Sequence, residues 1–537
     1  MSQVNPNYDV VIVGGGHNGL TAAAYLAKSG RSVLVLEQLD TVGGAAVSAQ
    51  AFAGIDAQLS RYSYLVSLLP GRIIADLGLN IRLARRRYSS YTPVPGQPDR
   101  GLLVDVVDEA ATASSFSRIG EASDAEGFSR FYAKTAALAS TLWPTLTEPL
   151  LTESEVRSLV RDDSLWREFI ERPLGEVIEA DIAGDIARGV AFTDGIIGTF
   201  ADAHSATLDQ NRCFLYHVIG GGTGNWDVPV GGMGAVSGEL ARAAKQAGAE
   251  LVTRARVTRI TPRPNDNEVE FTVGQPGIGD GDSQESSDHV ITARWVLSNV
   301  SPWVLGELLK EDLPKDHRPQ GAQIKVNLLL TRLPRLADAS VTPEQAFGGT
   351  FHINETYSQL TRAFDQARSG EIPETIPCEI YCHSLSDPSI LSPELHAAGF
   401  HTLTVFGLHT PHSLVTEENN DTMRERLVSG VLRSLNSVLG EPIEDCVAID
   451  AEGQPCIEGK TTLDLEHALN MTGGNIFHQP LSWPWLDDDA SLASPAERWG
   501  VATRHPRILV CGSGARRGGA VSGIGGHNAA MAVLESS

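Results

Sequence analysis

Three glycines and one acidic residue near the N-terminus have the spacing of a dinucleotide site. Gly14, Gly16 and Gly19 form the pattern Gly-x-Gly-x-x-Gly, and Glu37 follows them. In this pattern the first glycine permits a tight turn, the second lets backbone approach a pyrophosphate, and the third lets a helix pack on a strand. A carboxylate placed like Glu37 accepts the ribose hydroxyls of an adenosine. The alternative is a glycine-rich turn in an α/β domain that binds no nucleotide.

Two more glycine-rich segments favour FAD over NAD. Gly43-Gly44 follows Glu37 closely, and a second pair of bare backbone positions suits the longer flavin cofactor. Near the C-terminus, the apolar run Arg507–Cys511 leads into a glycine turn, Gly512–Gly526, and then into a helical pattern. A helix N-terminus there would point at an anionic or dipolar group, so we expect the end of the chain to cover the flavin.

The glycine turn needs a strand before it and a helix after it, and the sequence predicts both. Asp9–Val13 is a short apolar run typical of a buried parallel strand. Leu20, Ala23, Ala24 and Ala27 then recur with helical spacing, and Ser32–Leu36 reads as the next strand. A comparable glycine–helix–strand pattern follows Trp226, and in its last strand we place Val257 beside the adenine.

Composition limits the remaining classes of function. The 537 residues carry a net charge of −24, which disfavours nucleic acid as a partner, and no run approaches 18 apolar residues. The first predicted strand begins too early to leave room for a signal peptide, so we expect a cytoplasmic protein. A weak peripheral contact with the inner membrane and a homo-oligomer remain open. The six cysteines include no Cys-x-x-Cys, which disfavours a dithiol–disulfide site, and no metal site is predicted.

Two excursions from the nucleotide-binding halves are predicted to hold the substrate. Residues 89–219 have helical texture, with an apolar stretch at Ala191–Ile219. The second excursion contains three predicted strands of one sheet: Ile324–Leu330, Glu379–His383 and Leu403–Leu408. We expect Ala191–Ile219 and Ile324–Leu330 to wall one elongated apolar cavity. No second Gly-x-Gly-x-x-Gly follows these strands, so the electron acceptor is expected to be external, either oxygen or a quinone. The polar segment 275–289 is predicted to be a mobile loop.

Catalytic acid–base residues are harder to assign. His217, His478 and Arg61 are the candidates, although a histidine in an apolar stretch is more often a hydrogen-bonded structural residue. Arg61, Tyr62 and Tyr64 would either line a flavin-facing surface or belong to an amphipathic helix.

Several ordered blocks resemble one family. LEQLDTVGGAAVS, LSRYSYLVSLL, NWDVPVGGMGAVSGELA, IKVNLLLTRLP and CGSGARRGGAVSGIGGHNAA occur in this order along nearly the whole chain. Together they resemble the phytoene desaturase-like FAD-dependent oxidoreductases, and most closely the branch called pyridine nucleotide-disulphide oxidoreductase domain-containing protein 2. The resemblance implies an α/β fold of the glutathione-reductase or amine-oxidase type. It has a discontinuous Rossmann-like FAD-binding domain (residues 1–88, 225–302 and 480–537) and an inserted α+β substrate domain (residues 89–224 and 303–479).

The resemblance also implies which residues bind FAD. They are Gly14, Gly16, His17, Asn18, Gly19, Glu37, Gly43, Gly44, Ala45, Val257, Gly512, Ser513, Gly519, Val521 and Gly526. Two positions depart from the family pattern. Ala45 stands where carotenoid desaturases usually have arginine, and Arg516-Arg517 replace a usual His-Pro. That arginine pair would either change the polarity beside the flavin or be solvated.

The reaction implied is dehydrogenation of an apolar, isoprenoid-like or lipid-like small molecule, with hydride transfer to flavin N5. Three alternatives stay open on the same fold. They are a flavin amine oxidase, a redox-neutral polyene isomerase, and a non-catalytic flavin-bearing interaction protein.

Overall fold

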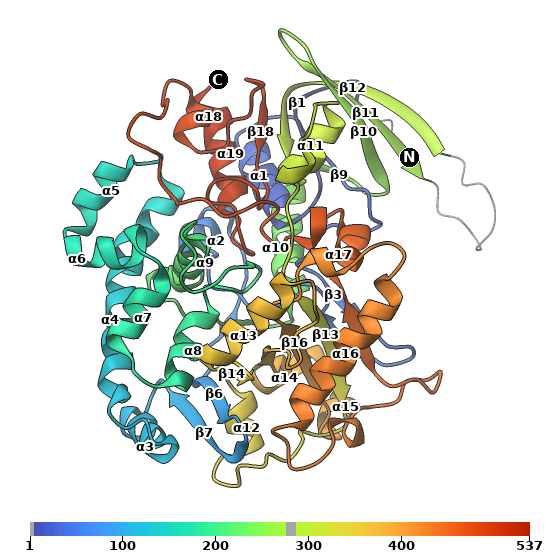
Figure 1. Cartoon of the computed structure of the whole chain (residues 1–537). Coiled ribbons are helices and arrows are strands. Elements are labelled where there is room, and N and C mark those ends of the chain that lie inside the picture. Colours follow the sequence, from blue (N-terminus) through green and yellow to red (C-terminus); the bar gives the residue numbers. More distant parts are fainter. Residues whose placement is uncertain (1–4, 275–285, 537) are drawn as a thin grey trace.

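Two seven-stranded sheets organise the chain (Figure 1). The computed structural model describes residues 5–274 and 286–536, so most of the predicted polar loop, 275–285, lies outside the described residues. The rest of that predicted loop is the start of a strand. Helices pack along both sheets, and the predicted α/β fold class is confirmed.

The first sheet is parallel at its centre, around β1 (Asn7–Val13). β1 pairs in parallel with β2 and with the end of the long strand β12, and β12 also pairs in parallel with β18. Val10 to Val13 are at most 4% exposed, because such a strand is covered on both faces. The strand order is β10 (Ala255–Pro262), β11 (Asn267–Gly274), β12 (Ser286–Ser298), β1, β2 (Val33–Leu36) and β9 (Glu250–Val252), with β18 (Ile508–Val510) on β12.

Helix α1 (His17–Lys28) leaves β1 through the predicted glycine turn and is central to this domain. It packs between α10 (Met233–Gln246) and α19 (Ile524–Glu535). A Cβ atom on Gly526 would lie 1.9 Å from the carbonyl oxygen of Asn18, so α19 approaches α1 more closely than any residue with a side chain allows. The C-terminal segment is thereby fixed against the start of α1.

The second sheet is antiparallel except where β14 pairs with β6. Its order is β17 (Ile457–Lys460), β13 (Ile324–Leu330), β16 (His401–Gly407), β15 (Cys378–Tyr381), β14 (Thr350–Ile353), β6 (Tyr88–Val94) and β7 (Gln97–Asp105). The three strands predicted in residues 324–408 are confirmed, although His383 begins a helix. The hairpin β6–β7 corrects the helical prediction for residues 89–105. Its turn contains Gly96 at φ +70°, a signal that the surrounding helical texture obscured.

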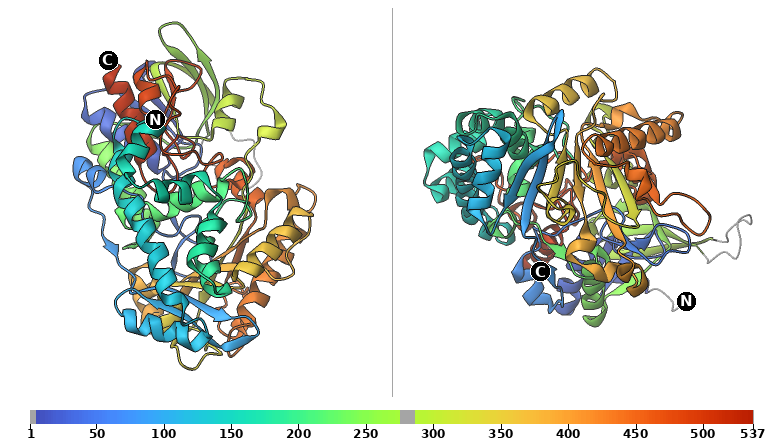
Figure 2. Two further views of the ribbon diagram at one scale, coloured as in Figure 1. Left: turned by 60° about the vertical axis from the view of Figure 1, so that its left-hand side comes forward. Right: turned by 90° about the horizontal axis from the view of Figure 1, so that it is seen from below.

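The two sheets and the inserted helices occupy different parts of the molecule. Helices α3 to α9 stand along one side, and the second sheet with its own helices lies along the other (Figures 1 and 2). The inserted helices are α3 (Glu109–Ile119), α4 (Asp124–Leu142), α5 (Glu153–Val160), α6 (Asp163–Trp166), α7 (Leu174–Asp181), α8 (Asp185–Thr193) and α9 (Asp209–Val218). The others are α2 (Gly71–Leu77), α11 (Pro302–Leu308), α12 (Pro343–Phe347), α13 (Tyr357–Arg368), α14 (His383–Ser386), α15 (Pro393–Ala397), α16 (Asn420–Asn436), α17 (Thr462–Leu469) and α18 (Pro495–Arg498).

Short two-stranded sheets complete the fold. They pair β3 (Ser48–Gln50) with β4 (Gln58–Ser60), and β5 (Leu83–Ala84) with β8 (Val228–Pro229).

All six cysteines are buried and free. Within residues 5–274 and 286–536, no helix combines the length and apolarity needed to cross a membrane.

Candidate functional site

The glycine turn after β1 has the geometry that the sequence pattern predicts. Gly14 has φ +95°, a conformation that favours glycine. A Cβ on Gly16 would lie 2.8 Å from Nδ2 of Asn299, and one on Gly19 would lie 2.4 Å from the carbonyl oxygen of Gly14. Asn299 directly follows the neighbouring strand β12. Its amide donates to the same Gly14 carbonyl over 3.1 Å and so holds the turn in place.

The second glycine pair lies directly against this turn. Gly43 and Gly44 have φ of +126° and +58°, and the Gly43 N–H donates to the carbonyl of Gly15 over 2.8 Å. A Cβ on Gly44 would come within 3.2 Å of the Gly16 Cα. The backbone segments around Gly16 and Gly44 therefore lie against each other without intervening side chains and form one continuous surface.

Glu37 closes this surface at the end of β2. One carboxylate oxygen accepts from the Gly15 N–H at 2.7 Å, and the other accepts from the Leu39 N–H at 2.9 Å. The side chain is 6% exposed, and burial raises the pKa of Glu37 above its usual value. Each oxygen keeps lone-pair capacity toward a ligand, and Val257 lines the same region from β10.

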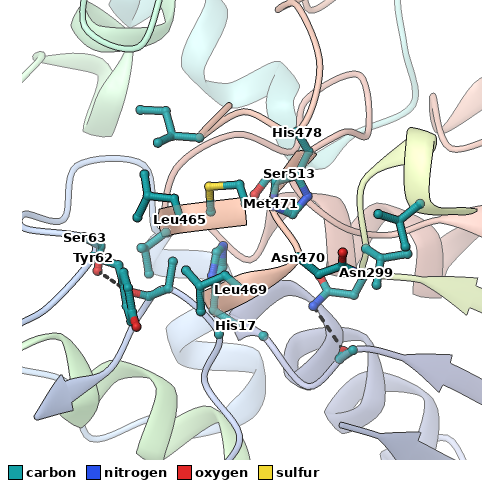
Figure 3. Close-up of a pocket in the computed structure, with 18 of the residues that line it drawn as sticks. His17, Tyr62, Ser63, Asn299, Leu465, Leu469, Asn470, Met471, His478 and Ser513 are labelled. Atoms are coloured by element: carbon teal, nitrogen blue, oxygen red, sulfur yellow. Dashed lines mark hydrogen bonds between the residues drawn. The ribbon is translucent and has the colours of Figure 1, made fainter. Parts of the chain in front are cut away.

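These elements form one end of a cavity of about 290 Å³, the main cavity. The other end is lined mainly by aromatic side chains, together with Met471, from segments far apart in the sequence, and Figure 3 shows part of it. The nucleotide-end lining includes Gly14, Gly16, His17, Glu37, Gly44, Ala45, Val257 and Asn299. The lining of the other end includes Tyr62, Tyr64, Tyr216, His217, Trp226, Phe406, Met471, Phe477, His478, Ser513 and Val521.

Two histidines, the buried His17 and the half-buried His478, line the cavity with buried nitrogens that lack partners among the described residues. His17 Nε2, at the start of α1, and His478 Nδ1 have no hydrogen-bond partner among the described residues. Burial lowers the pKa of each to about 4, and His478 also adopts φ +67°. Both rings are therefore neutral near pH 7, and the unpartnered nitrogens can bond to a group held in the cavity. Figure 3 shows both histidines at the same cavity.

His217 on α9 has a defined orientation. Its Nδ1 lies 2.8 Å from the Cys213 carbonyl, so Nδ1 carries the proton and donates. The His217 carbonyl accepts from the Trp226 indole over 2.9 Å. Burial lowers the pKa of His217 to about 4, so its Nε2 is a weak base.

Other predicted residues lie outside the main cavity. Arg61 forms an ion pair with Glu458 at 2.6 Å, and its segment is not helical. The Asn18 amide donates to the Gly518 carbonyl. The remaining positions are five glycines: Gly19, Gly512 and Gly526 pack against backbone, whereas Gly43 and Gly519 pack against side chains.

The arginine pair corrects both sequence-based interpretations. Arg517 is 8% exposed and donates to the carbonyls of Thr145 and Glu148 at 2.8 and 2.7 Å. Arg516 donates to the carbonyls of Trp483 and Trp485. The pair neither lines the main cavity nor is solvated, because it joins the C-terminal turn to neighbouring loops.

The predicted walls also need correction. Tyr216 and His217 line the main cavity from Ala191–Ile219, but the whole of β13 is buried in the second sheet and the neighbouring strand β16 contributes Phe406 instead. Asn299, Trp226, Phe406 and Met471 were not predicted. Their only sequence signals were a strand end, for Asn299, and a position before the second glycine pattern, for Trp226.

Comparisons with known proteins agree with this geometry. A family model described as an NAD(P)-binding Rossmann-like domain matches residues 12–72. An uncharacterized protein of Mycobacterium tuberculosis is 54% identical, with 99% of this chain and 98% of that protein covered. Pyridine nucleotide-disulfide oxidoreductase domain-containing protein 2 of Rattus norvegicus is 29% identical, with 99% and 94% covered. Among solved structures, putrescine oxidase bound to putrescine has the same fold at 18% identity and a TM-score of 0.55, with 98% and 99% covered.

The extent of these matches shows that the likeness includes both sheets as well as the glycine turn. The predicted recognition is confirmed. The chain therefore belongs to one family with the mycobacterial protein, and its likeness over nearly the whole length to pyridine nucleotide-disulfide oxidoreductase domain-containing protein 2 supports an FAD-dependent oxidoreductase of this kind.

Proposed function

We propose that the protein binds FAD and dehydrogenates an apolar small molecule held at the aromatic end of the main cavity. The observation that carries this proposal is the continuity of that cavity. It runs from a backbone cradle beside Glu37 to a chamber lined by Tyr64, Trp226 and Phe406. A cofactor and its substrate could therefore meet within one cavity.

The residues present fit FAD. The bare backbone at Gly14, Gly16 and Gly44 leaves room for a pyrophosphate, and Glu37 has acceptor capacity for ribose hydroxyls. The unpartnered nitrogens of His17 and His478 supply polar contacts in the same cavity. When bound, the flavin supplies a two-electron acceptor for a hydride.

The chain's own side chains bind and orient the substrate and exclude water. Tyr64 stacks with Trp226 at 5.9 Å between ring centroids, and Phe406 lies 4.8 Å from Tyr64. Flat, polarizable surfaces of this kind suit a conjugated or branched hydrocarbon. We propose an external acceptor, oxygen or a quinone, for reoxidation.

An amine substrate is the second candidate. The rings of Tyr64, Tyr216 and Trp226 could hold a cationic amine through their faces. The fold shared with putrescine oxidase is compatible with this alternative. The two candidates differ in whether the substrate is charged.

A test starts from the purified protein, which should be yellow and release FAD, not FMN, on denaturation. Anaerobic bleaching of the flavin is then followed with two panels, acyclic isoprenoid polyenes in detergent micelles and aliphatic amines. We expect bleaching by the polyene panel. Bleaching by amines alone would favour the second candidate, and a colourless protein that cannot be reconstituted with FAD would refute both. NADH should reduce the flavin slowly, since the sequence contains no second dinucleotide motif.

A further inference from the structure

A small hollow of about 40 Å³ adjoins the main cavity beside α9. Tyr216 lines both spaces. Most of the side chains around the hollow are apolar and come from α9, from the loop after residue 480 and from segments packed on them, so we name it the apolar hollow. They include Leu68, Leu146, Leu215, Ile219, Leu481 and Trp483.

The charged side chains of the apolar hollow already have partners in the protein. Arg212 forms an ion pair with Asp209, and its guanidinium lies 5.8 Å from the centroid of the Trp483 ring. Arg516 and Arg517 donate to backbone carbonyls of neighbouring loops. A hydrocarbon group therefore suits this hollow better than an anion does.

The side chain of Tyr216 lies at the boundary between the two spaces. A Cβ on Gly519, which lines the apolar hollow, would lie 2.5 Å from Cε2 of the Tyr216 ring. The ring of Phe477, which lines the main cavity, has its centroid 5.0 Å from that of Tyr216. Tyr216 thus contacts residues of both spaces.

A second boundary residue, Trp226, is held differently. Trp226 separates the main cavity from a polar space of about 140 Å³. Its indole N–H donates to the His217 carbonyl over 2.9 Å, and its own carbonyl accepts from Arg86 over 3.1 Å. The buried Tyr216 hydroxyl, by contrast, has no hydrogen-bond partner among the described residues. A buried hydroxyl without a partner is unfavourable, so hydrogen bonding does not favour this position of the Tyr216 side chain over another.

We propose that the apolar hollow is the distal part of the substrate site and that Tyr216 controls access to it. This proposal rests on the proposed function, because it concerns the same cavity. A substrate whose reacting carbon lies at the aromatic end of the main cavity extends its far end past Tyr216 into the hollow. That far end is a hydrocarbon, since the charged groups of the lining are already paired. The site then selects elongated apolar molecules over compact ones, and Tyr216 limits their length.

The first test measures binding instead of turnover. The oxidised holoprotein is titrated with acyclic isoprenoid hydrocarbons of two, four and six isoprene units in detergent micelles, and Kd is obtained from the change in flavin absorbance. Leu481→Trp adds an indole to the half-buried loop that lines the hollow. It should weaken binding of the longest hydrocarbon roughly tenfold and leave that of the shortest unchanged.

The matched control is Leu159→Trp on α5, at a side chain that is 40% exposed. It should bind every hydrocarbon as the wild type does. An equal loss for all lengths in Leu481→Trp would make the hollow an entrance and overturn the proposal, as would wild-type binding throughout.

The second test removes the boundary. Tyr216→Ala should tighten binding of the longest hydrocarbon roughly tenfold relative to the shortest, whereas Tyr216→Phe, which keeps the ring, should keep the wild-type dependence on length. FAD content is measured in both variants, because Tyr216 contacts the C-terminal turn at Gly519. An unchanged dependence on length in a flavin-loaded Tyr216→Ala would overturn the proposal, and the Leu481→Trp comparison decides the question if this variant loses FAD.

The third test separates this proposal from the proposed function. Crystals of the holoprotein are placed under xenon pressure, because apolar cavities take up xenon. Xenon should occupy the apolar hollow in the wild type and be missing there in Leu481→Trp. If no isoprenoid binds to the wild type, the proposed apolar substrate fails, and the xenon site still decides whether the hollow accepts an apolar group. A wild-type hollow without xenon would overturn our proposal.

Discussion

The two sheets line the main cavity with different groups, one mainly with backbone and the other with a side chain. The first sheet presents mainly backbone, at the turns around Gly14, Gly16 and Gly44, and one buried carboxylate, Glu37. The strands of the second sheet contribute one lining side chain, Phe406, and bury charged groups beside it. A backbone cradle takes any ligand of the right shape and negative charge. A wall of side chains discriminates between ligands by their shape and polarity.

A single row across the second sheet illustrates the contrast. Lys325 pairs with Phe406, Phe406 with Glu379, and Glu379 with His352, so one row crosses four strands. All four side chains are at most 3% exposed. Buried charges are costly unless they find partners or change protonation state. The row therefore concentrates buried titratable groups in the second sheet, unlike the apolar strands β1 and β2 of the first sheet.

The largest effect is expected from filling the backbone cradle. Gly16→Trp would place an indole where bare backbone faces the cavity, so we expect FAD content to fall to near zero. Gly16→Ala should reduce FAD content only partly, since its Cβ meets the movable Asn299 amide at 2.8 Å. Absorbance of the purified protein measures this, and Gly238→Trp, where no atom lies within 4 Å, is the matched control. Full FAD content in Gly16→Trp would show that the backbone at Gly16 does not contact the cofactor.

A smaller effect is expected where the C-terminal turn is joined to the inserted helices. Arg517→Leu removes the donor for the carbonyls of Thr145 and Glu148 in a buried position, which should destabilise the protein by about 3 kcal/mol. Thermal unfolding measures the change. The control Arg172→Leu, at a side chain that is 63% exposed, should change stability by less than about 0.5 kcal/mol. Equal shifts for both variants would mean that Arg517 contributes nothing specific.

The last expected effect, at Lys325, depends on pH, and it sharpens the contrast between the sheets. Lys325 donates to the carbonyls of Ser60 and Ser63 at 2.8 and 2.9 Å, yet burial lowers its pKa from 10.5 to about 7. Between pH 7 and 10.5 the unfolded chain therefore binds more protons at this site. The site's contribution to stability rises with pH across that window, by at most about 1.4 kcal/mol per pH unit.

Lys325→Met removes this dependence. Relative to wild type, the variant should be most stable at pH 6 and should lose that advantage by pH 10. Melting temperatures measured across the range test the sign, with exposed Lys245→Met as the control. Parallel curves for wild type and Lys325→Met would show that the buried amine is not protonated in the way we propose.

The predictable part of the site was the part that depends on backbone. Gly14, Gly16, Glu37 and Gly44 could be placed from sequence, because a tight turn and a close approach admit few residue types. The wall from the second sheet was placed less well. Phe406 lines the main cavity where Ile324–Leu330 was expected, because an apolar run shows that a strand is buried without showing which neighbour faces the cavity.

The sequence by itself determined the strand–turn–helix unit, the return of the C-terminal segment to it, and the strands β13, β15 and β16. These features depend on local spacing, which a chain carries along its own length. Only the tertiary structure decided that the rings of Tyr64 and Tyr381 lie 4.7 Å apart, and that Arg517 bonds to carbonyls more than 350 positions earlier in the chain. Such contacts join residues with no fixed sequence separation, and burial, which changes their protonation, is a property of the packed fold.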